Sequence, residues 1–283
     1  MNLRQVRKKT KSVGNVKKIT RSMQLVSAIK MKKSQQSAIE ARPYQENLEQ
    51  VIYKIIGKID RSLSLLLSTP ANSVKKELVV VVTSNKGLCG AFNFEIFRYI
   101  AKHIDIQTKD FIVVGKKGAS FIAKSGGTIV ADFSSPQPQT KTSALFSYIL
   151  ELFLKGSYEK ISILYNKFVS TLKTDVTLQT LLPLKFPFET TIEERQVHEY
   201  VIEPSPQFII DPLLRNYLEE KIRNIFVQSE AGEHSARMVA MKNATDNAND
   251  VIYNLTLLGN KLRQEKITNE LLDMVTAKES VGN

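Results

Sequence analysis

Apolar residues follow two different rhythms along the 283-residue chain. Near both ends they recur every three or four residues, which is the spacing of one face of a helix. Between about residues 78 and 210 they occur in short uninterrupted runs, the pattern of buried strands. All nine prolines lie between Pro43 and Pro212, and proline disrupts helix interiors. We therefore expect a long helix at each end and a mixed domain between them.

The first predicted helix occupies residues 1–57, from about Leu3 to about Gly57, and residues 58–77 form a connector. The sequence ARPY at 41–44 is expected either to end this helix or to bend it. Apolar residues at helical spacing predict its buried face. They are Val6, Val13, Val16, Ile19, Met23 and Val26.

The second predicted helix occupies residues 211–283. Asp211 suits the N-cap, and Pro212 suits the first helical position, which needs no N–H donor. Nothing stops the helix before about Lys278, so its length is on the order of 100 Å. Helices this long need each other for burial, and we predict that they form a long antiparallel coiled coil. The apolar stripe expected on this helix comprises Leu214, Leu218, Ile222, Ile225, Val251, Leu255, Leu258 and Leu262.

Small residues recur at every fourth position in the second helix, at 232, 236, 240, 244 and 248. Steps of four turn the row by ~40° each, so it spirals around the helix. One interpretation is that alanine is simply the best helix former. The other is a helix that is narrow on two sides, one facing the first helix and one facing something outside the pair.

The region 78–210 alternates predicted strands and helices, which is typical of an α/β domain with a largely parallel sheet. The expected strands are 78–83, 111–114, 128–130 and 161–164, with later strands at 176–182 and 199–203. The expected helices are 94–103 and 142–153.

Positive charge is concentrated in the first 40 residues, which hold eleven Lys or Arg and one acidic residue, Glu40. They supply +10 of the net charge of +12. Such a segment suits nucleic acid, acidic lipid or an acidic protein surface, or it simply keeps a helix solvated. No aromatic residue precedes Tyr44, so a base-stacking platform is missing, although contacts to phosphate alone stay open.

The stretch SNKGLCGAFN (84–93) is the most enzyme-like feature, because a strand leads through a glycine-bracketed loop into a helix. It matches neither phosphate-loop pattern. We interpret Gly87 and Gly90 as permitting a tight turn, and Cys89 as a buried inert thiol in preference to a nucleophile. The three histidines, at 103, 198 and 234, lie in separate predicted elements. We predict no catalytic residue, cofactor or metal site.

Other classes are also disfavoured. A single cysteine excludes a disulfide framework and a four-cysteine zinc site. No apolar run approaches the ~18 residues of a transmembrane helix, and no secretory signal core is recognisable. We expect a soluble intracellular protein with no membrane span.

Four stretches, in the right order, resemble the gamma-subunit family of F-type ATP synthases. They are NVKKITRSMQLVSAIKM (15–31), ARPY (41–44), SNKGLCGAFN (84–93), and ARMVAMKNATDNAND with LRQEKITNELLDMV (236–250 and 262–275). The resemblance implies a central rotor stalk. Its coiled coil would stand inside a collar of alpha and catalytic beta subunits, with a central Rossmann-like α/β domain against the epsilon subunit and the membrane c-ring. Ion flow would turn the ring and the shaft, and ATP chemistry would belong to the collar rather than to this chain.

The resemblance also implies particular contacts, with protein rather than nucleic acid. The residues expected to meet an acidic loop of the catalytic subunits are Lys17, Lys18, Arg21 and Met23. The residues expected to contact the collar from the second helix are Arg263 and Gln264. A structural loop is expected at Lys86, Gly87, Leu88, Cys89 and Gly90. The expected location is the cytoplasmic face of a bacterial inner membrane, as a peripheral subunit.

The chain departs from the family pattern in a few places. Gly259 stands where tyrosine is usual, which loosens the helix by ~1 kcal/mol relative to alanine. Lys86 stands where arginine is common, and the paired-cysteine insert of the plastid type is missing. The residues alone leave two alternatives, a basic coiled-coil adaptor for nucleic acid or anionic membrane, and an α/β enzyme that uses Cys89.

Overall fold

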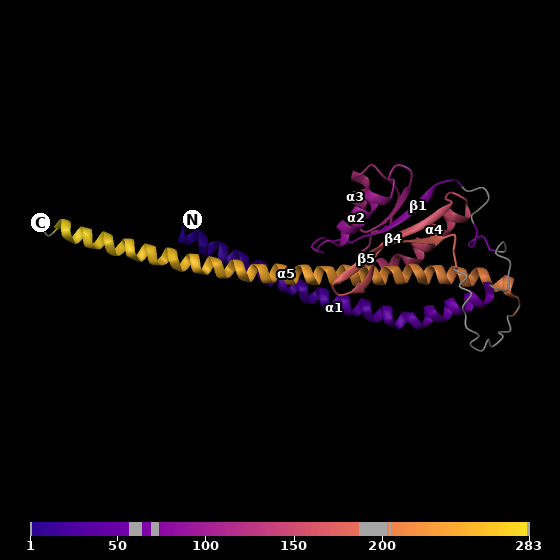
Figure 1. The fold of residues 1–283 in the computed structure, drawn as a ribbon, viewed down its shortest axis with the longest axis horizontal. Helices are drawn as coiled ribbons and strands as arrows, with labels where there is room; N and C mark the ends of the chain where they lie inside the picture. The colour runs from indigo at the N-terminus through magenta and orange to yellow at the C-terminus, as the bar shows by residue number, and fades with distance from the viewer. Residues whose placement is uncertain (1, 57–63, 69–73, 187–202, 204, 282–283) are drawn as a thin grey trace. The chain divides into compact units, whose positions relative to one another are not determined.

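The computed structural model describes residues 2–56, 64–68, 74–186, 203 and 205–281. The chain forms two compact units, one of Met1–Ala28 with Arg237–Asn283 and one of Ile29–Ala236. We call them the distal unit and the central unit. Both contain part of each long helix, and the sheet belongs to the central unit (Figure 1).

The two predicted terminal helices are confirmed as α1 (Leu3–Ile56), which continues through Pro43, and α5 (Pro206–Val281). The predicted start of α5 at Asp211 is wrong. The helix begins at Pro206, six residues before the predicted first helical residue Pro212, and the Phe208 N–H donates to the Ser205 carbonyl at 3.2 Å. Pro206 takes the first position, where no N–H is needed, and Pro212 lies inside the helix. The Asp211 carboxylate instead accepts from Ser64 Oγ at 2.5 Å and pairs with Arg215 at 3.5 Å.

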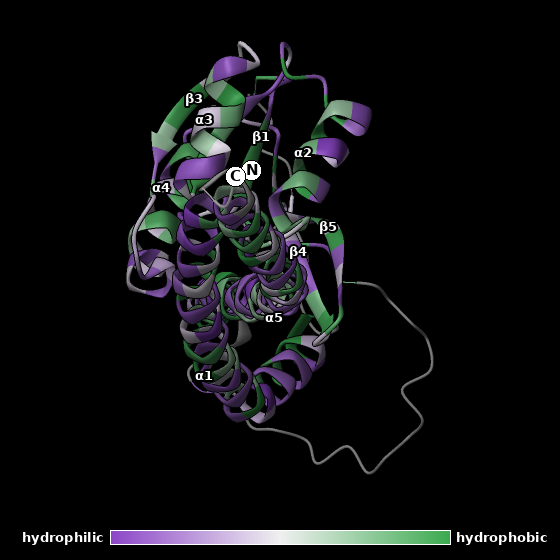
Figure 2. Cartoon of the chain, turned by 90° about the vertical axis from the view of Figure 1, so that its left-hand side faces the viewer, coloured by the Kyte–Doolittle hydropathy of each residue, from purple (hydrophilic) through white to green (hydrophobic). Residues whose placement is uncertain are grey.

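One face of α1 repeats in heptads. Steps of three and four residues alternate from Leu3 to Ile55, and every position on this seam except Lys17 is at least partly buried. A period of 3.5 residues is the spacing of a left-handed coiled coil. Much of the seam is small or polar, as in Thr20, Gln24, Ser27, Ser34 and Ala38. Figure 2 shows that α1 is largely hydrophilic over its length.

The predicted buried face of α1 is therefore only partly right. Val6 and Val13 lie in the seam. Three others face outward, namely Val16, Ile19 and Val26, which are 49%, 59% and 53% exposed. Apolar identity misled the prediction, because burial follows the heptad period even where the residue on it is threonine or serine.

Within the distal unit, α5 supplies a matching seam. Its members are Met241, Thr245, Ala248, Ile252, Leu255, Gly259 and Leu262. Thr20 and Thr245 hydrogen-bond through their hydroxyls at 2.8 Å, and a Cβ on Gly259 would lie 3.5 Å from Val6 Cγ1. The partner residue on α5 thus falls in number as α1 advances, so the pairing is antiparallel. Val251 and Leu258 of the predicted stripe are 44% and 38% exposed and lie outside this seam.

The same pairing holds within the central unit. Gln45 Nε2 donates to the Glu220 carbonyl at 3.4 Å, and Tyr217 OH donates to Glu49 at 2.9 Å. Leu48, Ile52, Leu214, Leu218 and Ile222 are buried in one apolar cluster. The predicted antiparallel coiled coil of the two terminal helices is confirmed.

The central unit contains a five-stranded sheet in the order β3-β2-β1-β4-β5. The strands are β1 (Glu77–Val82), β2 (Asp110–Val114), β3 (Thr128–Asp132), β4 (Lys160–Ser170) and β5 (Lys173–Leu182). The first four are parallel, and β5 pairs antiparallel with β4. The predicted α/β domain with a largely parallel sheet is confirmed. The predicted strand at 199–203 falls, apart from residue 203, outside the described residues.

The helices of this domain are α2 (Phe92–His103), α3 (Lys116–Lys124), the short η2 (Pro138–Lys141) and α4 (Thr142–Leu154). Only α2 and α4 were predicted. The sequence KKGASFIAK of α3 contains a glycine and is only nine residues long, so its helical signal is weak.

Alternate residues of the central strands bury against different helices. Leu78, Val80 and Val82 share a core with α4 and with residues of α1 and α5. Val79 and Val81 pack with α2 and α3 on the other face. Because both faces are covered, the strand after Glu77 can be the uninterrupted apolar run LVVVV.

Candidate partner-contact surface

The predicted contact residues of α1 lie on the solvent side of the distal unit. Lys17, Lys18 and Arg21 are exposed, and Arg21 Nη1 donates to Gln24 Oε1 at 3.1 Å. Met23 is partly buried. These three basic side chains are therefore exposed to solvent.

The predicted contact residues of α5 lie elsewhere along the coiled coil. Arg263 and Gln264 are exposed and directly follow Leu262 of the seam. The register of the helix pair places Ala248 opposite Lys17, so Arg263 lies fifteen residues, or about 22 Å, farther along α5. The structure thus does not bring the two predicted groups together, and they form separate positions on the same unit.

Charge in the distal unit is asymmetric between its helices. Before Ile29, α1 carries eight Lys or Arg and no acidic residue. From Arg237 onward the chain carries six basic and six acidic residues, some of which pair along the helix, such as Lys266 with Glu270 at 3.3 Å. The positive field belongs to the α1 face, which is the face that an acidic partner would select.

An exposed apolar stripe near the end of α5 was missed from the sequence. Ile267, Leu271 and Met274 are 49%, 57% and 67% exposed and recur at steps of four and three residues. Seam positions after Leu262 would be Lys266 and Asn269, which are polar. The apolar residues have moved to a different face, and this shift was the signal in the sequence. These three residues lie beyond Leu262, which pairs with the start of α1, so no α1 residue covers them.

The loop after β1 is organised by its own side chains. The Ser84 N–H donates to Asn93 Oδ1 at 3.0 Å, and Asn93 Nδ2 donates to Ser84 Oγ at 2.7 Å and to Cys89 Sγ at 3.2 Å. Cys89 is 2% exposed. Its other hydrogen-bonding neighbours are the Ser84 hydroxyl and the Lys86 carbonyl, neither of which is a general base.

The tight turn in this loop differs in detail from the prediction. Positive φ angles occur at Leu88 (63°) and Gly90 (57°), not at Gly87. Gly90 therefore has the expected conformational role, whereas Gly87 does not need glycine for its φ angle. Leu88 carries a positive φ and is 63% exposed. Lys86 is also exposed.

The start of α3 is already occupied by the chain itself. The N–H groups of Lys116, Lys117 and Gly118 donate to Asn85 Oδ1, the Ser84 carbonyl and Thr83 Oγ1, at 3.2, 3.2 and 2.8 Å. A phosphate at a helix N-terminus needs these donors. Because these N–H groups already donate to acceptors of the chain, this helix start does not offer them to a phosphate.

The described part of the chain lacks two further features. Among those residues, no group of three or more His, Cys, Asp or Glu is arranged to hold a metal ion. None of the helices described is both long enough and apolar enough to cross a membrane.

The fold defines a class of protein: an antiparallel coiled coil of two long terminal helices with an α/β domain between them in the sequence. The family model described as ATP synthase matches residues 2–281. The ATP synthase gamma chain of Bdellovibrio bacteriovorus is 36% identical over 293 residues, covering 99% of both chains. That of Geobacter metallireducens is 36% identical over 292 residues with the same coverage. The chain belongs to the ATP synthase gamma-chain family.

Solved structures agree on the fold. A chain of the Euglena gracilis mitochondrial ATP synthase, in an OSCP/F1/c-ring assembly, has a TM-score of 0.69 and 20% identity, covering 99% of this chain and 94% of that one. A chain in the rotor of the same enzyme has a TM-score of 0.65 and 19% identity, covering 94% and 98%.

Proposed function

We propose that this chain is the central rotor shaft of a rotary ATP synthase. It couples ion flow through the membrane ring to ATP synthesis and hydrolysis in the catalytic subunits. The observation that carries the proposal is the antiparallel heptad pairing of α1 and α5 in a chain whose family match extends from residue 2 to residue 281. That full-length match favours a rotor over the basic adaptor and over an enzyme that uses Cys89.

The exposed faces of the distal unit suit a shaft that turns inside a collar. Apolar contact is non-directional, so the stripe of Ile267, Leu271 and Met274 can slide against an apolar sleeve without fixed partners. Charge attraction acts over a longer range, and the basic face with Lys17 and Arg21 suits an acidic loop of each catalytic subunit in turn. Lys18 and Met23 belong to the same proposed contact, and Arg263 with Gln264 forms a second one.

The chain itself is proposed to be non-catalytic. The buried, base-free setting of Cys89 and the occupied N-terminus of α3 support this assignment. The proposed partners are the alpha and beta subunits of the head, the epsilon subunit and the c-ring. The proposed location is peripheral, on the cytoplasmic face of a bacterial inner membrane.

The second contact, formed by Arg263 and Gln264, is tested with Arg263→Ala in the assembled complex. Because Arg263 is exposed, the variant should fold normally and yet pump fewer ions per ATP hydrolysed. Lys242→Ala is the matched control, since it removes an equally exposed cation of α5 outside the proposed contacts. Loss of folding in the Arg263 variant, or equal effects of both substitutions, would contradict the assignment.

A further inference from the structure

The hairpin formed by β4 and β5 extends beyond the sheet. Parallel pairing of β4 with β1 ends at Leu164, whereas β4 and β5 continue to pair with each other from Tyr165 with Thr177 as far as Ser170 with Lys173. This free part of the hairpin, residues 165–177, therefore needs support from elsewhere. Figure 1 shows it beside α5.

The support is a recess on α5 made by two small residues of the central unit. Ser235, which is 1% exposed, donates its hydroxyl to the Thr171 carbonyl at 2.5 Å. One turn earlier, a Cβ on Gly232 would lie 3.0 Å from Thr174 Cγ2 and 3.4 Å from the ring of Phe92. The missing side chain at Gly232 is what lets the hairpin approach the helix.

The same corner is tied to the rest of the domain. Asn166 of β4 is fully buried and donates Nδ2 to the Phe92 carbonyl, at the start of α2, at 2.7 Å. The hairpin, the N-terminus of α2 and α5 thus meet at one point. We call this point the hairpin seat, comprising Phe92, Asn166, Thr171, Thr174, Gly232 and Ser235.

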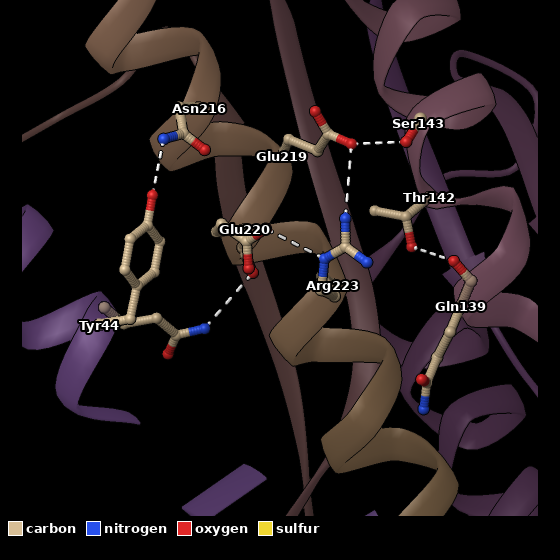
Figure 3. A network of polar contacts seen from close by, with 9 residues as sticks. Tyr44, Gln139, Thr142, Ser143, Asn216, Glu219, Glu220 and Arg223 are labelled. Atoms are coloured by element: carbon tan, nitrogen blue, oxygen red, sulfur yellow. Dashed lines mark hydrogen bonds and ion pairs between the residues drawn. The ribbon is translucent and has the colours of Figure 1, made fainter. Parts of the chain in front are cut away.

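A second attachment to α5 lies nearer its start. Glu219 of α5 accepts from Ser143 Oγ of α4 at 2.5 Å, and Figure 3 shows this link between the two helices. Glu219 also pairs with Arg223 of its own helix at 3.6 Å. Gln139 of η2 donates to Glu230 at 2.7 Å, and burial raises the pKa of the Glu230 carboxyl. Glu219 and Ser235 are sixteen residues, or about 24 Å, apart along the helix. Two supports so far apart resist both tilting and rolling of the helix against the domain.

We propose that the hairpin seat is a torque-bearing joint, in which Gly232 and Ser235 position α5 so that rotation of the central domain is transmitted to the shaft. The inference rests on the proposed rotor function. It also explains part of the small-residue row. Gly232 is small because the outer neighbour of α5 there is a hairpin of its own central domain.

The test uses the whole membrane-bound complex, with ATP hydrolysis and ATP-driven ion uptake measured in the same vesicles. Ser235→Ala removes the bond to Thr171 and should raise the population of the unseated hairpin about fivefold. Gly232→Ala places a methyl group against Thr174 Cγ2. In both variants we expect hydrolysis and assembly close to wild type, with fewer ions transported per ATP.

Rescue and control variants separate a joint from a generally weakened fold. Thr174→Ser deletes the opposing methyl group but keeps the hydroxyl, so combining it with Gly232→Ala should restore the ion-to-ATP ratio. Gly14→Ala is the matched control, because a Cβ there meets nothing within 4 Å. If Gly232→Ala fails to assemble, Ser235→Ala decides the matter.

If Ser235→Ala leaves the number of ions transported per ATP unchanged, the proposed joint is wrong. The same conclusion follows if hydrolysis and transport fall in proportion, because the ratio is then also unchanged. A wild-type complex that hydrolyses ATP without any coupled ion transport would instead overturn the rotor function itself. The two failures are therefore distinguishable in one set of vesicles.

Discussion

At the scale of single residues, the seam of the distal unit depends on polar groups that satisfy one another. Thr20 and Thr245 are 8% and 6% exposed, and their hydroxyls also lie within hydrogen-bonding distance of backbone carbonyls of their own helices. A buried hydroxyl that loses its partner is costly, whereas replacing both partners by apolar groups of similar shape is nearly neutral. Such a pair also disfavours other registers, because a shifted helix would separate the two hydroxyls.

We predict that Thr20→Val and Thr245→Val each lower the free energy of unfolding by about 1 kcal/mol, and that the double variant loses less than the two together. Urea unfolding of the full chain, followed by helical circular dichroism, measures this. Thr256→Val is the control, because Thr256 is exposed and bonds only within α5. Strictly additive losses would show that the two hydroxyls do not interact.

Two glycines should respond oppositely to alanine. At Gly259 a Cβ would meet Val6 at 3.5 Å, an ordinary contact, so Gly259→Ala should stabilise the chain by up to about 1 kcal/mol. At Gly115, where φ is 116°, a Cβ would lie 2.1 Å from the Thr83 carbonyl oxygen, so Gly115→Ala should strongly destabilise it. Thermal unfolding of both variants checks the contrast, and two shifts of the same sign would contradict the local geometry.

At the scale of elements, the ends of the strands carry charges that the sheet holds together. Glu77 of β1 lies 2.5 Å from Lys109 Nζ and 3.5 Å from Lys160 Nζ, each beside the start of a neighbouring strand. The hydrogen bond from Lys109 holds the pKa of the Glu77 carboxyl below its usual 4.5, despite partial burial that acts in the opposite direction.

Because the folded pKa of Glu77 is lowered, its contribution to stability is present above about pH 4.5 and is lost as the pH falls through the folded value. We therefore predict that Glu77→Gln is less stable than wild type at pH 7, and that the difference shrinks below pH 4.5. Denaturant unfolding across this range measures it. Glu151→Gln, in an exposed pair with Lys155, should change stability less at every pH. A difference for Glu77→Gln that grows on acidification would contradict the ion pair.

The sequence predicted the helices and strands better than it predicted which of their faces are buried. Long proline-free ends and the run LVVVVT were strong local signals, so both helices and the central strands could be predicted. The buried face of α1 could not, because half of its seam is polar and the apolar Val16 and Ile19 face outward. Likewise, Pro212 resembles a helix start, but a second proline at Pro206 begins the helix before it. The contacts of the hairpin seat join residues at least 58 positions apart, which no local pattern reveals.

At the scale of the whole chain, one polypeptide contains both a pair of long helices with exposed faces and a sheet domain attached to the same helices. The family match spans residues 2–281, so it includes both the helix pair and the sheet domain. Apart from Lys17, which occupies a seam position, the basic residues of α1 before Ile29 and the apolar stripe of α5 lie outside the seam and are exposed.

The most direct measurement is rotation of this chain in a head complex assembled from its own alpha and beta subunits. A bead is attached through a cysteine introduced at exposed Lys124 of α3, in a chain with Cys89→Ser, and the head is fixed to a surface. The account predicts sustained rotation in one direction when ATP is added, stopping when ATP is removed. A head that hydrolyses ATP at full rate while the bead only diffuses would contradict it.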